Sequence, residues 1–348
     1  MKTLKKPEES SVCANIRYED TPLLERGRDS RIFLEEETHV YYVDDRTDFM
    51  SVTTWNHMHF AEFVPHETVK TTMEKAAREE TKYTGMTREE ILKMWADEGD
   101  EASRAGTDFH YAVECYYRGK PIDQEIQKSV EWSYFLNFAR DHSNLTPYKS
   151  EWRVFDEDLK LAGTIDMTFV TDDGKILIYD WKRCKEIRRE NTWQSSTTPE
   201  ISHLQDSNFW HYALQLNTYK YILEKRYNRE VTEMCIVSMH PNNESETYDK
   251  YELPNLQAEI ADLMIVRMDM MKHPNYVTST GEIMKRQAEI LNFMATIKTL
   301  RCKLTELVEE FIEKETIDWK FFNDAVCKLV EKGVLKTDPL NQDVWITL

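Results

Sequence analysis

Three charged residues end two apolar segments in the stretch GTIDMTFVTDDGKILIYDWKRCKEI, residues 163–187. Asp166 lies among apolar residues, and Asp180 and Lys182 close the apolar run 176–179. Two neighbouring carboxylates repel each other unless a cation separates them. Mg²⁺ suits a sparse pair, because it keeps several waters and takes further ligands from substrate phosphate. The residues therefore predict metal-assisted hydrolysis of a phosphodiester, with Lys182 orienting or deprotonating the nucleophile or neutralising the transition state.

This chemistry requires the three charges to share one face of a β-hairpin. Side chains alternate between faces along a strand, so Asp180 and Lys182 point the same way. A three-residue loop places Asp166 opposite Asp180, whereas a two-residue turn puts the aspartates on opposite faces. We therefore predict an odd-length loop at residues 172–174, with Gly174 in the left-handed region.

Strand and helix patterns alternate around this hairpin and predict an α/β fold with a mixed sheet flanked by helices. Residues 40–43 and the Thr-rich residues 51–55 predict a separate N-terminal hairpin. The further strands are expected at residues 151–155, 163–171, 175–181 and 233–241, and the helices at residues 89–95, 107–117, 124–140, 209–227 and 256–273.

Composition limits the function classes. The six cysteines contain no CxxC pair, which argues against a zinc site or an iron–sulfur cluster. The net charge of −18 disfavours a protein that coats nucleic acid, but residues 182–190 hold five bases against two acids. No apolar run is long enough for a membrane span, and the first residues lack a targeting pattern. We expect a soluble intracellular protein.

The motifs resemble the PD-(D/E)XK nuclease superfamily, specifically its RecB-like branch. Asp166 and Asp180-Trp181-Lys182 match the D…(D/E)xK core, with Gly163 as in the G-x-x-D pattern of that branch. Downstream, residues 215–219 match the Q-x-x-x-Y helix, and upstream, residues 106–110 match the helix with a metal-reaching histidine. An isolated D…DxK pattern is common by chance, and its alternative is a capped turn beside a solvated strand edge. Three motifs in the right order are far more specific.

The layout from SVTTW (51–55) onward is similar to mitochondrial genome maintenance exonuclease and phage exonucleases. The segments YDWKRCKEI and HYALQLNTYKYILEK read most like RecB-like nucleases of large DNA viruses. The resemblance covers residues 40–272. We expect four parts of the chain: a flexible N-terminal segment at 1–38, a hairpin and helices at 39–100, a RecB-like nuclease core at 101–275, and, outside the resemblance, a helical C-terminal extension at 284–348. The extension has the outline of a winged helix, and a helical buttress with an edge hairpin is the alternative.

The resemblance also implies the roles of single residues. Asp166, Asp180 and His110 would bind Mg²⁺ or Mn²⁺, with the Trp181 carbonyl as a further ligand. Lys182 would be catalytic. Gln215 and Tyr219, four residues apart on one helix face, would orient the lysine or hold DNA. Glu114 and Glu151 could extend the metal shell, although a surface carboxylate is the simpler interpretation of Glu114.

Basic and aromatic residues near the motif could bind the substrate. Arg183, Lys185 and Arg188 could contact phosphates; the alternative for Arg188 and Arg189 is a solvated face paired with neighbouring glutamates. The tryptophans near the motif could stack on unpaired bases, although aromatic side chains are usually core; they are Trp152, Trp181, Trp193 and Trp210.

Together these features indicate a metal-dependent DNA nuclease, an exonuclease on single-stranded DNA or DNA ends in replication, recombination or repair. A structure-specific endonuclease or an RNase with the same core is one alternative, and a catalytically silent nucleic-acid-binding protein is another. The sequence has no GxxxxGK[ST] motif, so a helicase or recombination partner would be a separate protein. The expected location is the cytoplasm, or the nucleus or a viral factory if a virus encodes the protein.

Overall fold

The computed structural model describes residues 21–36, 38–272, 335–337 and 344–346. The chain divides into two compact units, residues 1–281 and residues 282–348. None of the described helices has the length and apolar composition that a membrane span requires.

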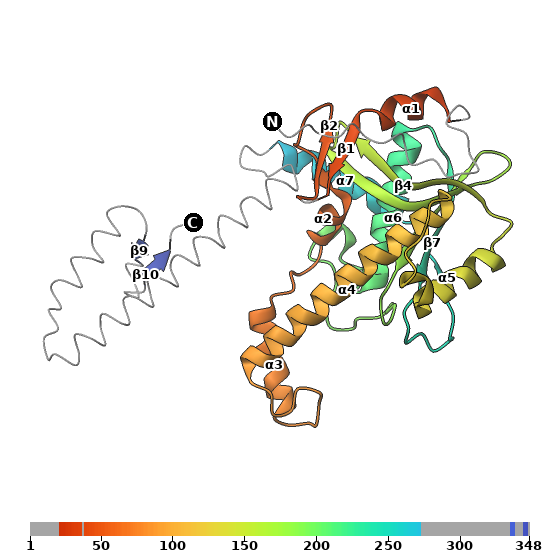
Figure 1. The fold of residues 1–348 in the computed structure, drawn as a ribbon. Helices are drawn as coiled ribbons and strands as arrows, with labels where there is room; N and C mark the ends of the chain where they lie inside the picture. The colour runs from red at the N-terminus through yellow and green to blue at the C-terminus, as the bar shows by residue number, and fades with distance from the viewer. Residues whose placement is uncertain (1–20, 37, 273–334, 338–343, 347–348) are drawn as a thin grey trace, which may run out of the picture. The chain divides into compact units, whose positions relative to one another are not determined.

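A mixed sheet forms the centre of the first unit (Figure 1). Its strands are β3 (Met50–Ser51), β4 (Thr146–Asp156), β5 (Leu161–Val170), β6 (Ile176–Lys182), β7 (Val231–Ser238) and β8 (Asp249–Glu252). β5 pairs with β4 along one edge, and with β6 and the short β3 along the other. The β6–β7 and β3–β5 pairs are parallel, and the remaining pairs are antiparallel. The predicted α/β fold with a mixed sheet is confirmed.

Helices cover both faces of the sheet. The helices described in this unit are α1 (Leu23–Asp29), α2 (Val52–His57), α3 (Pro65–Ala76), α4 (Arg88–Tyr117), α5 (Val130–Asp141), α6 (Asn208–Arg226) and α7 (Gln257–Met271). Aromatic residues of α4 and α5, such as Phe109 and Phe135, pack with Phe169 and Trp181 of the sheet. On the other face, Phe209 of α6 packs on β7. The N-terminal half of α4, with α3 beside it, extends away from the sheet (Figure 1).

Two predicted helix boundaries differ from the structure. The segments predicted at 89–95 and 107–117 are one helix, α4, which begins at a capping box formed by Thr87 and Glu90. Thr107 caps nothing, because its hydroxyl donates to the Ser103 carbonyl inside that helix. The helix predicted from residue 124 begins at Val130, after a 3₁₀ turn at Ile126–Lys128.

The hairpin predicted at residues 40–55 is wrong. β2 (Val40–Val43) pairs with the preceding strand β1 (Ile32–Glu35), and residues 52–57 form α2. The Ser51 hydroxyl accepts a hydrogen bond from the Thr54 amide at 3.0 Å, which caps the new helix. Ser and Thr favour such caps, so a local hydrogen bond outweighs the β propensity of the threonines.

Charged side chains attach the N-terminal elements to the sheet. The buried Lys149 ammonium on β4 lies 2.9 Å from Glu25 and 2.7 Å from Asp29, both on α1. Residues 21–36, within the segment expected to be flexible, thus include α1 and β1. In the second unit, β9 (Leu335–Thr337) and β10 (Val344–Ile346) pair antiparallel where a terminal hairpin was predicted. The helices predicted at 284–333 lie outside the described residues.

Candidate active site

The β5–β6 hairpin has the predicted register. Val170 pairs with Ile176 and Met167 with Tyr179, and the loop between the strands closes with the Thr171 amide donating to the Lys175 carbonyl at 2.9 Å. Gly174 has a φ of 82°, in the left-handed region. The odd-length loop is therefore confirmed. Because strand side chains alternate, Trp181 packs with α4 and α5, whereas Lys182, the next residue, lies against Tyr212 of α6.

The two strands separate at the candidate site. Their ladder ends at the Met167–Tyr179 pair, so the main chain of Trp181 forms no ladder pair with the main chain of β5. Its amide donates to Asp166 Oδ2 at 2.9 Å, and its carbonyl lies 2.9 Å from His110 Nε2. The side chains of Asp166 and His110 thus make the hydrogen bonds that a neighbouring strand would otherwise make to Trp181. These bonds fix the position of both side chains relative to β6.

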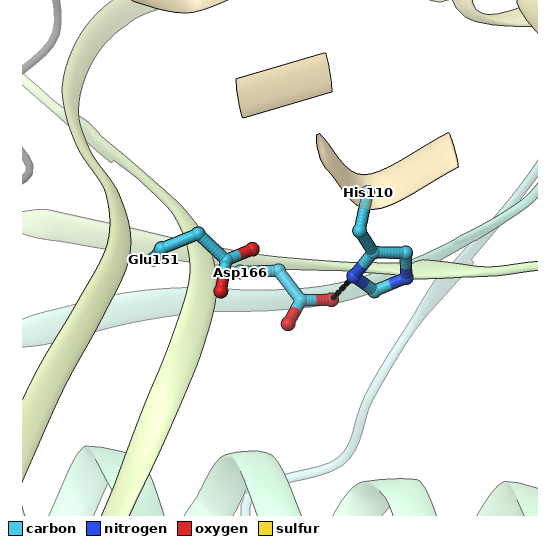
Figure 2. Close-up of side chains that lie close together, drawn as sticks. All are labelled: His110, Glu151 and Asp166. Atoms are coloured by element: carbon cyan, nitrogen blue, oxygen red, sulfur yellow. Dashed lines mark ion pairs between the residues drawn. The ribbon is translucent and has the colours of Figure 1, made fainter. Parts of the chain in front are cut away.

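His110 comes from a separate helix, α4, as the motif predicted. A carbonyl oxygen can only accept a hydrogen bond, so Nε2 of His110 carries the proton that binds Trp181. Its Nδ1 lies 3.6 Å from Asp166 Oδ2 (Figure 2). Metal-binding histidines commonly donate their second ring N–H to a carbonyl in this way, which leaves the other nitrogen free to coordinate.

Glu151, which the sequence suggested could extend the metal shell, belongs to a group of three possible metal ligands. One ligand atom from each of His110, Glu151 and Asp166 lies within 4.8 Å of the others (Figure 2). Glu151 lies on β4 across from Asp166, since its neighbours Ser150 and Trp152 pair on either side of that residue. Its φ of 49° is rare for a non-glycine residue inside a strand. Such a conformation costs about 1–3 kcal/mol and is typical of functional sites.

Two carboxyl groups of the site, Glu151 and Asp180, have raised pKa values. Burial raises the pKa of Glu151 well above its ordinary value, and the charges of Asp166 and Glu114 raise it further. Burial and the Asp166 charge raise the pKa of Asp180 to about 7. Burial and the neighbouring negative charge thus both oppose ionisation of Glu151 and Asp180. A divalent cation would remove that repulsion, so the donor set fits a metal of the Mg²⁺ or Mn²⁺ kind.

Lys182 is held beside these acids. Its ammonium lies 2.5 Å from Asp180 Oδ2 and 5.0 Å from the centre of the Tyr212 ring. Burial favours a lower pKa for Lys182, but Asp180 and Asp166 raise it above its ordinary value. Asp180, predicted as a metal ligand, is outside the group of His110, Glu151 and Asp166 and is paired with Lys182 instead. Sequence reasoning missed Tyr212, whose position three residues before Gln215 places it on the same side of α6.

The G-x-x-D and Q-x-x-x-Y motifs meet in one contact. A Cβ atom on Gly163 would lie 2.6 Å from Tyr219 Cε1, so the tyrosine ring occupies the space that any other residue would need. The Tyr219 hydroxyl accepts a hydrogen bond from Gln215 Nε2 at 3.3 Å. Tyr219 is buried and Gln215 is half-buried. Tyr219 therefore holds Gln215 from the interior of the protein and is not itself exposed to solvent.

The predicted phosphate contacts separate into two kinds. Arg183 forms an ion pair with Glu131 of α5 at 2.7 Å, with both side chains largely covered. Lys185 and Arg188 are exposed, and Arg188 pairs with Glu186. Glu114 pairs with Arg118 on α4.

The sequence profile of the PD-(D/E)XK nuclease superfamily matches residues 66–282, which is more than half of the chain and includes every residue of this site. The chain belongs to the PD-(D/E)XK nuclease superfamily. It is therefore a nuclease, with a nucleic acid as substrate, in a superfamily whose members typically use divalent metals.

The solved structures that are similar to the chain include two that we describe here. One is a protein from Eubacterium rectale named as a candidate exonuclease, with 9% identity over 74% of this chain and 84% of that one, at a TM-score of 0.32. The other is SSO0001, with 12% identity over 66% of this chain and 79% of that one, at a TM-score of 0.27. We draw nothing further from either likeness. No curated protein is significantly similar to the chain.

Proposed function

We propose that the chain is a RecB-like, Mg²⁺- or Mn²⁺-dependent DNA nuclease, an exonuclease acting on single-stranded DNA or DNA ends in replication, recombination or repair. The observation that supports this most is the convergence of His110, Glu151 and Asp166 beside Asp180 and Lys182. A helicase or recombination protein is the partner that we propose.

In this proposal His110, Glu151 and Asp166 hold the cation, and Asp180 joins them when a cation competes with Lys182 for its carboxylate. The cation would neutralise phosphate charge and activate a water. His110 keeps Nδ1 directed at the site through its bond to the Trp181 carbonyl. The left-handed backbone of Glu151 holds its carboxylate there before any ligand binds, so little reorganisation is needed.

Lys182 acts on the nucleophile or on the charge of the transition state. Without a cation, the two aspartates keep its ammonium protonated. Positive charge at the carboxylates lowers that pKa again, because it cancels the field that raises it. Gln215, held by Tyr219, and the nearby Tyr212 limit where Lys182 can point.

The direct test incubates the full chain with end-labelled single-stranded DNA, blunt duplex DNA and single-stranded RNA. We expect single-stranded DNA to be degraded from an end in Mg²⁺ or Mn²⁺ and to remain intact in EDTA. Release of mononucleotides or short fragments from the labelled end, resolved on a denaturing gel, identifies an exonuclease. Internal fragments would favour the structure-specific endonuclease, and cleavage of RNA alone would favour the RNase. If all three substrates stay intact in both metals, the enzymatic proposal is wrong.

Glu151→Gln tests the metal group separately. We expect the Mg²⁺ concentration for half-maximal cleavage to rise about 10- to 100-fold, because an anionic ligand is lost. In EDTA the variant should unfold at a higher temperature than the wild type, because burial and neighbouring negative charges oppose the ionisation of Glu151, and a glutamine carries no charge. The matched control is Glu230→Gln, an exposed glutamate beside Lys175 at the far end of β6. An unchanged metal requirement in Glu151→Gln would remove Glu151 from the group.

A further inference from the structure

One tryptophan among the described residues is presented to solvent. Trp193 is 92% exposed, whereas Trp152 and Trp181 are fully buried and Trp210 is half-covered, donating to the Arg189 carbonyl. Burying a large aromatic side chain normally stabilises a fold by about 1.5–3 kcal/mol. The chain does not use that stabilisation at Trp193, although the rest of its loop is well anchored.

The loop that carries Trp193 is held by its own hydrogen bonds. The Asn191 side chain accepts from the Trp193 amide at 3.1 Å and donates to the Asp206 carbonyl at 2.6 Å. The Asn191 amide donates to the Gln205 side chain at 2.7 Å. Across the loop, the Asp206 amide donates to the Gln194 carbonyl at 2.9 Å. The indole therefore projects from a defined turn, so its placement costs little entropy when it binds something.

This turn lies between the catalytic strand and the helix of the Q-x-x-x-Y motif. The segment that contains the turn begins directly after Lys182 at the end of β6 and leads into α6. The Arg188 main chain donates a hydrogen bond to the Asn208 side chain and accepts one from the Phe209 amide, both at the start of that helix. From Asn208 to Gln215 the helix rises only about 10 Å. The exposed cations Lys185, Arg188 and Arg189 lie on the same segment.

We propose that Trp193, on the segment that joins β6 to α6, is a stacking platform for an unpaired base of the substrate strand. This inference rests on the proposed function. The chain carries a net charge of −18, so its overall field repels a nucleic acid, and only the local cations attract the backbone. Stacking on an indole does not depend on charge and is worth about 1–3 kcal/mol per base. Bases in a duplex are already stacked on their neighbours, so this platform favours single strands and frayed ends.

The test measures binding of the full chain to a labelled oligo(dT) in EDTA, where cleavage does not occur, by fluorescence anisotropy. Trp193→Ala should weaken binding about 5- to 150-fold, the equivalent of one lost stack. Trp193→Phe should recover much of the loss, because a phenyl ring also stacks. Binding to a blunt duplex should be unchanged. Asn191→Ala, which keeps the indole but removes the bonds that hold the turn, should show a smaller loss.

An oligonucleotide in which abasic sites replace the bases decides whether the contact is to a base. Wild type and Trp193→Ala should bind it equally, because there is nothing to stack. The control Leu23→Ala changes another exposed apolar side chain, on α1, and should bind oligo(dT) as the wild type does. Equal binding of oligo(dT) by wild type and Trp193→Ala overturns the inference, as does an equal loss on the abasic strand. If the wild type cleaves DNA although one of these two results is found, the proposed function is kept and only the role of Trp193 is rejected. If the wild type neither binds nor cleaves any nucleic acid, the proposed function and the role of Trp193 are both rejected.

Discussion

Lys182→Ala is expected to lower the rate of cleavage about 10²- to 10⁴-fold, the range for losing a positioned acid–base group. The reason is geometric: the ammonium lies beside Asp180 and Tyr212, where the charge of Asp166, a member of the proposed metal group, also acts on it. Binding of oligo(dT) should change little, because Lys182 acts at the reacting phosphate, whereas the affinity depends on contacts along the whole bound strand. Single-turnover cleavage in saturating Mg²⁺ measures the effect.

Two further variants make this result specific. Lys175→Ala removes a lysine from the other end of the same hairpin, where it pairs with exposed acids, and should leave the rate unchanged. Lys182→Arg separates the possible roles of the lysine. A guanidinium stays protonated, so this variant should be inactive if Lys182 must give up its proton and partly active if only its charge matters. Cleavage by Lys182→Ala at the wild-type rate would exclude a catalytic role for this residue.

Gly163→Ala is expected to destabilise the protein by about 1–3 kcal/mol, the usual cost of overpacking a core. The new methyl group would lie 2.6 Å from Tyr219 Cε1, so a buried tyrosine ring would have to move. Because Tyr219 holds Gln215, the cleavage rate should fall as well. Urea unfolding of the metal-free protein and single-turnover cleavage measure the two effects.

The control for this substitution is Gly106→Ala on α4, where a new Cβ meets nothing within 4 Å. Helix propensity predicts that it stabilises the protein by up to about 1 kcal/mol. Gly163→Ala combined with Tyr219→Ala should cost less than the sum of the two single variants, because the clash has been removed. A fully additive double variant would show that the contact between Gly163 and Tyr219 does not carry the effect.

The sequence by itself determined the fold class and the geometry of the catalytic hairpin. Both depend on local periodicity: strand side chains alternate with a period of two, so the charges of Asp166, Asp180 and Lys182 require one register and an odd-length loop. The motif with His110 also pointed to a second element reaching the same place. The N-terminal hairpin was predicted wrongly, because the serine cap that turns residues 52–57 into a helix competes with β propensity within a few residues.

Only the tertiary structure decided which other side chains share the site. Glu151 reaches the site because its backbone is left-handed, which its residue type does not predict. Gly163 is required because Tyr219, 56 positions later in the chain, fills the space beside it. Arg183 and Trp193 look equally able to bind DNA in the sequence, yet one is paired with Glu131 and the other is open to solvent. Periodicity determines which face of an element a residue lies on. What that face meets depends on contacts between distant segments, and these form only when the chain packs.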